Sequence, residues 1–322
     1  MFANKIKTRS FHSTPRSLVI AVALVLAMYD MCTSAAAQQK SFASAEEAVQ
    51  AAVAAAKSDD DKALLGIFGN DAKDLLSSGD AVADRARRQE FLKSYEEKHQ
   101  LVNDGDKMIL VIGNQEWPLP IPVVKQGSRW VFDTKAGREE ILNRRIGENE
   151  LTTIQVLLAI VDAQREYARK DRDGDGILEY AQQFRSVPGK QNGLYWEAKP
   201  GEEESPLGPL AADARVEGYK AASAGSKPVP FHGYYFKILT GQGKNAPGGA
   251  YNYLVKGNLI GGFAVIAAPA QYGNSGVMTF LVNHDGVVYE KDLGKNTLEL
   301  AKKMSTFDPD KSWKKTDQTK MP

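Results

Sequence analysis

Acidic side chains are spaced to suit a metal ion in the segment 171–179. The sequence there is DRDGDGILE, which places carboxylates at Asp171, Asp173, Asp175 and Glu179 and a glycine directly after the third of them. Calcium loops use this alternation, because a tight turn then directs successive oxygens toward one hard cation. We therefore expect a calcium site formed by the four carboxylates and the backbone carbonyl of Ile177.

The twelfth position of this loop departs from the usual pattern. An EF-hand loop carries a bidentate glutamate there, whereas this chain has Gln182. The loss of that charged ligand predicts a site that is weaker than an EF-hand sensor or is completed from elsewhere in the fold. We expect a structural calcium ion that takes no direct part in catalysis. The alternative is a solvated acidic turn without metal, in which water screens the crowded aspartates.

The other polar residues form no recognisable catalytic set. Beyond residue 37 the chain has three histidines, His99, His232 and His284, which fall on different predicted elements and lack the spacing of a zinc site. A Gly-x-Ser-x-Gly motif is absent, and the paired glycines do not precede predicted helices, as a phosphate-binding loop requires. We predict no catalytic and no cofactor-binding residues, and we favour a binding protein over an enzyme.

The first residues resemble an export signal. The first 16 positions carry four basic residues, and residues 18–28 form an apolar run that is too short to span a bilayer comfortably. Small residues at 35–37 suit signal peptidase. We expect a signal peptide over 1–37, a periplasmic or secreted protein, and no membrane span after cleavage. The alternatives are a lipoprotein modified at Cys32 and an uncleaved anchor.

Cysteine use and charge narrow the class of partner. Cys32 is the only cysteine, so the mature chain would have no disulfide and no thiolate metal site. Removing residues 1–37 leaves 37 basic residues (41 minus 4) and 39 acidic ones (40 minus 1), a net charge of −2. Because no long basic block is present, a nucleic-acid partner is not expected. A protein or a small molecule remains as the partner.

Residues 42–136 read as a first α+β domain. Helix-forming patterns precede strand-forming ones, with 75–80 as a loop. The predicted helices span 42–58, 60–68 and 82–99, and the predicted strands span 108–113, 118–125 and 129–133. Helices followed by a curled antiparallel sheet resemble the cone-shaped nuclear-transport-factor-2-like fold.

Residues 149–310 read as a second α+β domain, after a connector over 137–148 that breaks at 146–149. A helix over 150–170 has its apolar residues at helical spacing and charged residues in its final turns. A shorter helix is expected over 209–222, and the basic tail over 311–322 is expected to be frayed. The predicted strands span 232–240, 250–255, 259–267, 277–283 and 287–291. A long helix packed on an antiparallel sheet is also the layout of pilins and pseudopilins.

Short segments along the chain indicate one family. They are LLSSGD (75–80), YEEKH (95–99), WPLPIP (117–122), ILNRRIG (141–147), the acidic loop with EYA (179–181), GLYW (193–196), SPLGP (205–209), HGYY (232–235), IGGF (260–263) and DGVVY (285–289). With them, residues 42–313 resemble the exported bacterial family catalogued as domain of unknown function 2950. The resemblance implies export and the domain limits, and it implies no chemistry.

The leading functional hypothesis is an exported, non-enzymatic binding or envelope-associated module with a structural calcium loop. Its ligand would be met at the mouth of the first domain or on the second sheet. One alternative is an enzyme, a hydrolase or isomerase, that uses the pocket of the first domain; another is a pilus-like assembly component. Aromatic residues are expected mainly in the core, with a subset available to a ligand: Trp117, Trp130, Tyr195, Trp196, Tyr234, Tyr235, Tyr251 and Tyr253.

Overall fold

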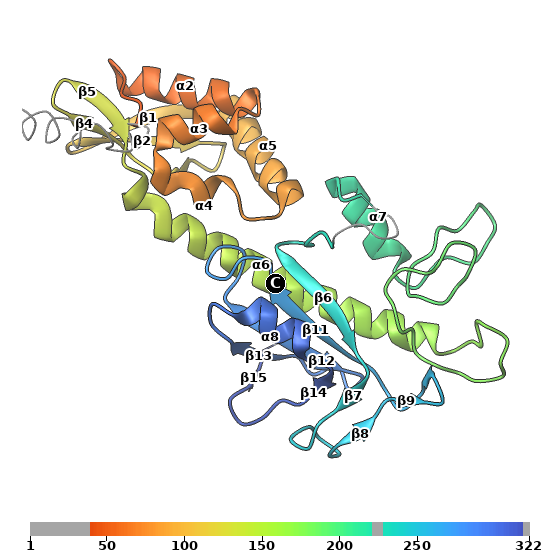
Figure 1. Ribbon diagram of the computed structural model, residues 1–322. Coiled ribbons are helices and arrows are strands. Elements are labelled where there is room, and N and C mark those ends of the chain that lie inside the picture. Colours follow the sequence, from red (N-terminus) through yellow and green to blue (C-terminus); the bar gives the residue numbers. More distant parts are fainter. Residues whose placement is uncertain (1–38, 221–227, 318–322) are drawn as a thin grey trace, which may run out of the picture. The chain divides into compact units, whose positions relative to one another are not determined.

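The computed structural model describes residues 39–220 and 228–317 (Figure 1). The predicted signal peptide over 1–37, with Cys32 and the cleavage site, lies outside these residues. Among the described residues, no helix combines the length and the apolar character needed to cross a membrane. Helices and antiparallel sheets are mixed along the chain, so the α+β class is confirmed.

Helices begin the described chain. They are α2 (Ala45–Lys57), α3 (Asp61–Phe68), the short η1 (Asn70–Ala72), α4 (Lys73–Leu76) and α5 (Ala81–Glu97). Side-chain caps fix three of their starts, because Ser44, Asp60 and Asp80 each accept hydrogen bonds from backbone N–H groups of the first turn. The loop predicted over 75–80 is shorter than expected, since α4 extends through Leu76.

An antiparallel sheet follows these helices. Its strands are β1 (His99–Asp104), β2 (Lys107–Ile112), β3 (Trp117–Pro118), β4 (Val123–Gln126) and β5 (Arg129–Phe132), in the order β1-β2-β4-β5 with β3 also on β2. The predicted helix over 82–99 therefore ends early, and His99 opens a strand. The first apolar core joins this sheet to α2 and α3 through residues such as Val49, Leu64, Val123 and Phe132.

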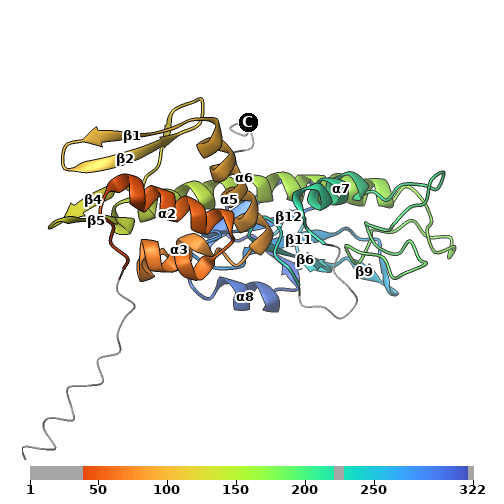
Figure 2. The same cartoon turned by 90° about the horizontal axis from the view of Figure 1, so that it is seen from above.

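A single helix, α6 (Thr134–Tyr167), runs through the predicted connector (Figure 2). The predicted break at 146–149 is wrong. Gly147 lies inside the helix with open space around it, and Asn149 is buried and donates its side-chain N–H to the carbonyl of Ser275 at 2.8 Å. Tertiary contacts therefore keep this stretch in a helix, although its sequence favours a turn. Ile141 packs against the first core, and Leu157 is buried in the second.

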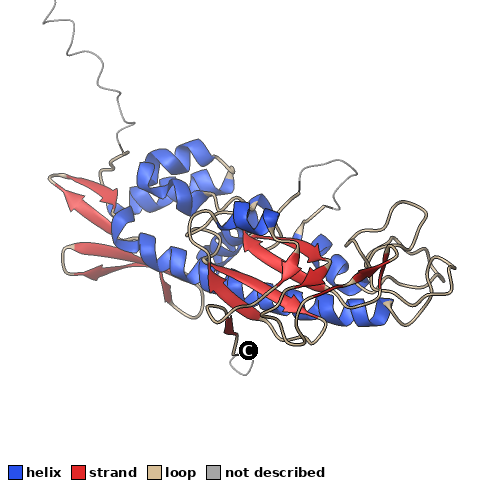
Figure 3. Ribbon diagram, turned by 60° about the horizontal axis from the view of Figure 1, so that its bottom comes forward, coloured by secondary structure: helices blue, strands red, loops and turns tan. Residues whose placement is uncertain are grey.

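The second sheet has the order β15-β13-β12-β11-β6, with every neighbouring pair antiparallel. Every residue of β11 is buried, so both faces of that strand are covered, and both α6 and α8 contact it (Figure 3). The bounds are β6 (Tyr234–Leu239), β11 (Ala264–Pro269), β12 (Met278–Asn283), β13 (Tyr289–Asp292), α8 (Thr297–Lys303) and β15 (Lys314–Lys315).

The prediction of a frayed tail from residue 311 is wrong for the part that the structure describes. Lys314 and Lys315 pair with β13, and Trp313 beside them is buried in the second core. Smaller elements complete the fold: α7 (Gly208–Glu217), β7 (Gly241–Gln242), β8 (Tyr251–Asn252), β9 (Leu254–Val255), β10 (Asn258–Leu259) and β14 (Thr306–Phe307).

Candidate functional site

The acidic loop follows the end of α6 and brings three predicted ligands together. One carboxylate oxygen from each of Asp171, Asp173 and Asp175 lies within 4.8 Å of the others, and all three side chains are exposed. Asp171 accepts hydrogen bonds from the N–H groups of Gly176 (2.9 Å) and Gly174 (2.7 Å), which lower the pKa of its carboxyl group. The loop therefore presents a compact set of carboxylate oxygens to solvent.

The other two predicted ligands, Glu179 and Ile177, also form hydrogen bonds. Glu179 lies outside the group of three, and its carboxylate accepts the N–H of Leu259 in β10 at 3.1 Å. Burial raises the pKa of Glu179, and the neighbouring charge of Asp173 raises it further. The N–H of Ile177 donates to Asp175 at 2.8 Å.

The loop is tied to the β9–β10 hairpin by side-chain bonds. Asn258 donates to the carboxylate of Asp175 at 2.7 Å, and Gln182 donates to the carbonyl of Gly257 at the same distance. Gln182 at the twelfth position therefore uses its amide to fix the loop.

Arg172, the second residue of the loop, points into the protein. Its side chain is only 4% exposed, and its guanidinium lies 5.0 Å from the ring centroids of both Tyr167 and Trp196. It donates to the carbonyl of Tyr167 at 3.2 Å and pairs with Glu203 at 3.3 Å. Sequence analysis missed this anchor, although an arginine inside an otherwise acidic loop was a visible signal.

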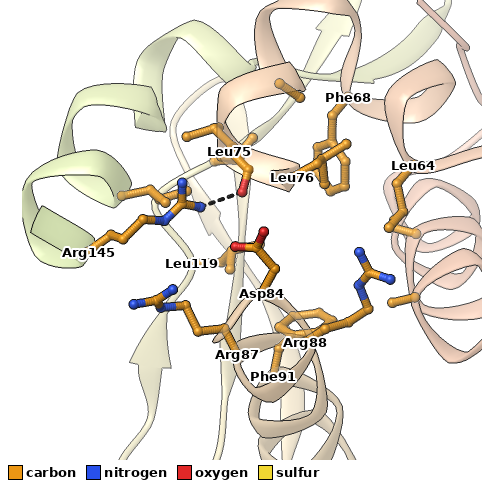
Figure 4. Close-up of a pocket in the computed structure, with 15 residues that line it drawn as sticks. Leu64, Phe68, Leu75, Leu76, Asp84, Arg87, Arg88, Phe91, Leu119 and Arg145 are labelled. Carbon is orange, nitrogen blue, oxygen red and sulfur yellow. Dashed lines mark hydrogen bonds between the residues drawn. The ribbon is translucent and has the colours of Figure 1, made fainter. Parts of the chain in front are cut away.

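A cavity of about 240 Å³ lies among the helices that begin the described chain and the start of α6 (Figure 4). Its walls come from α2, α3, α5 and α6, the turn at α4, and the segment between β3 and β4. No residue of a strand lines it, so it lies between helices rather than in the hollow of the sheet. Its apolar lining consists of Ala52, Ala56, Leu64, Phe68, Ala72, Leu75, Leu76, Phe91, Leu119, Ile121 and Ile141.

Four charged residues also line this cavity: Asp84, Arg87, Arg88 and Arg145. Asp84 accepts the N–H of Ser78 at 2.9 Å, and within the described chain no ion pair joins it to an arginine. Arg88 is already compensated, because its two terminal nitrogens bond the carboxylates of two exposed aspartates at 2.7 and 2.6 Å.

Arg145 is the most buried charge of the cavity, with 6% of its surface exposed. It donates to the carbonyls of Asp74 (2.8 Å) and Leu75 and to the side-chain oxygen of Asn274 (2.6 Å), all of which are neutral acceptors. Its Nε is buried and has no acceptor among the described residues. Burial lowers the pKa of Arg145, and the positive charge of Arg87 lowers it further.

Arg87 faces the same cavity from α5. Its Nη2 donates to Asn149 at 2.8 Å and pairs with the exposed Glu148 at 3.3 Å, while its Nη1 is buried without an acceptor among the described residues. Sequence analysis missed both arginines. For Arg145 the reason is that a break was expected in α6. As one helix, Leu142, Arg145 and Asn149 fall at helical spacing and are all buried, so a charge in line with a buried face was the available signal.

A second pocket of about 320 Å³ lies between α7 and the segment 184–195 and includes Tyr195 and Phe231. Its lining reaches Lys220, where the described chain is interrupted. We assign it no role.

The structure does not gather the remaining candidates. The three histidines lie on separate elements: β1 holds His99, and His232 and His284 lie in turns. Among the aromatic residues, Tyr234 and Tyr253 are fully buried, while the exposed ones lie on different sheets.

Comparison with known proteins identifies a family and no relative of assigned activity. No curated protein and no solved structure matches the chain. One family matches residues 39–316, which include both five-stranded sheets, the acidic loop and the helix-lined cavity. The chain belongs to this family, which is described as protein of unknown function (DUF2950).

Proposed function

We propose that this chain is a non-enzymatic binding module that holds a small ligand in the helix-lined cavity between residues 52 and 145. The observation that carries the proposal is the lining, which is apolar apart from four charged side chains. Small-molecule sites combine mostly apolar walls with a few polar groups that fix orientation. The volume of about 240 Å³ is just below the ~300–1,000 Å³ typical of ligand pockets, so the ligand would be small.

A neutral fluorescent probe tests whether the cavity binds. N-phenyl-1-naphthylamine should bind the wild type saturably with one site per chain. Ala56 lines the cavity, and Ala54 is exposed on the same helix. Ala56→Leu should fill part of the cavity and weaken probe binding at least about fivefold, a cost of about 1 kcal/mol. Ala54→Leu should bind as the wild type does.

Two results count against the proposal: no saturable binding to the wild type, and equal affinity for the two leucine variants when both retain the wild-type circular dichroism spectrum. A cavity of another size or place would give the second result.

The acidic loop is proposed as a structural calcium site. Its support is the carboxylate cluster of Asp171, Asp173 and Asp175, held by a loop that Arg172 and the bond to Asn258 fix in place. Glu179 and the Ile177 carbonyl are proposed as the remaining ligands. In this role the ion would clamp the end of α6 to the β9–β10 hairpin.

Export is proposed together with this role, on the basis of the basic and apolar pattern of residues 1–37. The proposed destination is the periplasm or the medium, with an association with the cell envelope. Cell fractionation and N-terminal sequencing of the mature protein test this part. A protein that keeps residues 1–37 and stays in the cytoplasm would contradict it.

One observation favours an enzyme as the second candidate. Asp84 lines the cavity, and its only hydrogen bond within the described chain is the N–H of Ser78 on one carboxylate oxygen. The other oxygen would be available as a general base for a hydrolase or isomerase. A turnover that Asp84→Asn abolishes, with ligand binding unchanged, would replace the binding-module proposal with this one.

We also propose that the chain resembles two known arrangements, the nuclear-transport-factor-2-like cone and the pilin layout. Helices before a sheet over residues 45–132 support a cone-like first domain, and α6 against β11 and β12 supports the pilin-like layout. Assembly into a pilus-like filament rests on that layout alone. Electron microscopy of the concentrated protein tests it, and particles that stay monomeric would remove it.

A further inference from the structure

We propose that the ligand of this cavity is a small amphipathic anion, with its carboxylate or phosphate held at Arg87 beside Arg145 and its hydrocarbon body on the apolar wall. The inference rests on the proposed binding function and adds the chemical class of the ligand. It predicts that neutral and cationic ligands of the same size bind more weakly.

The charges that line the cavity favour a negatively charged ligand. Three guanidinium groups and one carboxylate line it. Arg88 is neutralised by its two aspartates. Arg145 donates only to neutral acceptors but has the charge of Asp84 nearby, and Arg87 shares one exposed carboxylate at 3.3 Å. Asp84 offsets only one of these two positive charges. Because a buried charge without a full counter-charge is costly, an anion beside Arg87 would be favoured.

Two N–H groups of these arginines lack a hydrogen-bond acceptor. Nη1 of Arg87 and Nε of Arg145 are buried donors without an acceptor in the described chain. Leaving such a donor unpaired costs about 1–3 kcal/mol, and more for a charged group. Arg145 is fixed by three hydrogen bonds, so we assign it the role of a positive charge. Arg87 is less constrained, and a small rotation would bring its Nη1 to an oxygen of the ligand.

The two arginines lie close together at one side of the cavity. Arg87 and Arg145 are close enough for the charge of one to lower the pKa of the other. In Figure 4 they lie on the same side of the pocket with Asp84 beside them, while Phe68, Leu76 and Leu64 lie away from them. Arg88, which lies on the side of Leu64, is neutralised by its two aspartates. A polar end and an apolar end within one cavity select an amphipathic molecule over inorganic phosphate or a plain hydrocarbon.

Calorimetry with matched eight-carbon ligands tests the class. The probes are octanoate, octyl phosphate, octan-1-ol, octylammonium and inorganic phosphate. We expect octanoate or octyl phosphate to bind at least tenfold more tightly than octan-1-ol, and octylammonium and inorganic phosphate to bind more weakly still. Arg87→Gln should remove the tenfold advantage of the anion. Arg85→Gln is the matched control, because Arg85 is on the same helix, is exposed and does not line the cavity.

The outcomes separate this inference from the binding function itself. If octan-1-ol binds as tightly as octanoate, or if Arg85→Gln weakens octanoate as much as Arg87→Gln does, the anion inference is overturned and the cavity still binds. Inorganic phosphate as tight as octyl phosphate also overturns it. If neither the eight-carbon ligands nor the neutral fluorescent probe binds, the proposed function fails.

A second measurement applies if Arg87→Gln does not fold. In the wild type, rising sodium chloride should weaken octanoate binding and leave octan-1-ol binding unchanged, because salt screens only the charged head. Equal salt dependence of the two ligands would overturn the inference.

Discussion

Replacing Arg172 by alanine tests how the acidic loop is held to the end of α6. The guanidinium stacks at 5.0 Å on both Tyr167 and Trp196, and each cation–π contact contributes about 0.5–2 kcal/mol. Its bond to the Tyr167 carbonyl at 3.2 Å adds about 1.5–3 kcal/mol, as a charged donor does. Glu203 is 37% exposed, so its ion pair adds under ~1 kcal/mol. Because such contributions are not additive, we expect a net loss of about 3 kcal/mol in the free energy of unfolding.

Urea unfolding of four proteins measures this loss. Besides the wild type and Arg172→Ala, Arg172→Lys keeps the charge without the planar stacking, and it should lose about 1–2 kcal/mol. The matched control is Arg169→Ala, since Arg169 lies at the same helix end with an exposed side chain that forms no ion pair within the described chain. If Arg172→Ala and Arg169→Ala differ by less than ~0.5 kcal/mol, the difference expected of surface changes, the reasoning is refuted.

Three further predictions concern other parts of the fold. Gly147→Ala should stabilise the protein by about 0.5–1 kcal/mol in urea unfolding, because Gly147 is inside α6 with open space at its Cβ position; a loss of stability would show that the helix breaks there. Burial first, and then the charge of Glu150, raise the pKa of Glu290 above its ordinary 4.5, so the contribution of Glu290 to stability should fall as pH rises above 4.5, and Glu290→Gln should remove that contribution to the pH slope; equal pH slopes of the wild type and Glu290→Gln between pH 4.5 and 7 would contradict this cause. Calcium at a hundredfold excess over its dissociation constant should stabilise the wild type and the control Asp213→Ala by about 2.7 kcal/mol and leave Asp173→Ala unchanged; unfolding curves that a chelator does not move would remove the calcium site.

The sequence predicted the elements whose apolar residues form a clear helical stripe or a nearly continuous buried run. The second half of α6 and the strands β11 and β12 came from their apolar patterns. The strand β1 was missed because five of its six side chains are exposed, so no buried face marks it. The strand β15 was missed because Lys314 and Lys315 are polar and its place is fixed by pairing with β13.

The candidate sites differ in the same way. Three ligands of the acidic loop are close in sequence, so their spacing was enough to bring them together. A pocket in the first domain was expected, but its lining could not be predicted, because the walls come from segments between residues 52 and 145 that meet only after folding. Its charged end depends on Arg145, whose burial follows from the continuity of α6 and from the contact with Asn274.

A crystal structure of the protein with 8-bromooctanoate tests the central claim most directly. The anomalous signal of bromine locates the chain end, and the density locates the head group. We predict one bromine peak in the helix-lined cavity against Phe68 or Leu76, with a carboxylate oxygen within about 3 Å of Arg87, the distance of a charge-assisted hydrogen bond. A bromine peak only at the surface, or a carboxylate directed away from Arg87 and Arg145, would contradict the account.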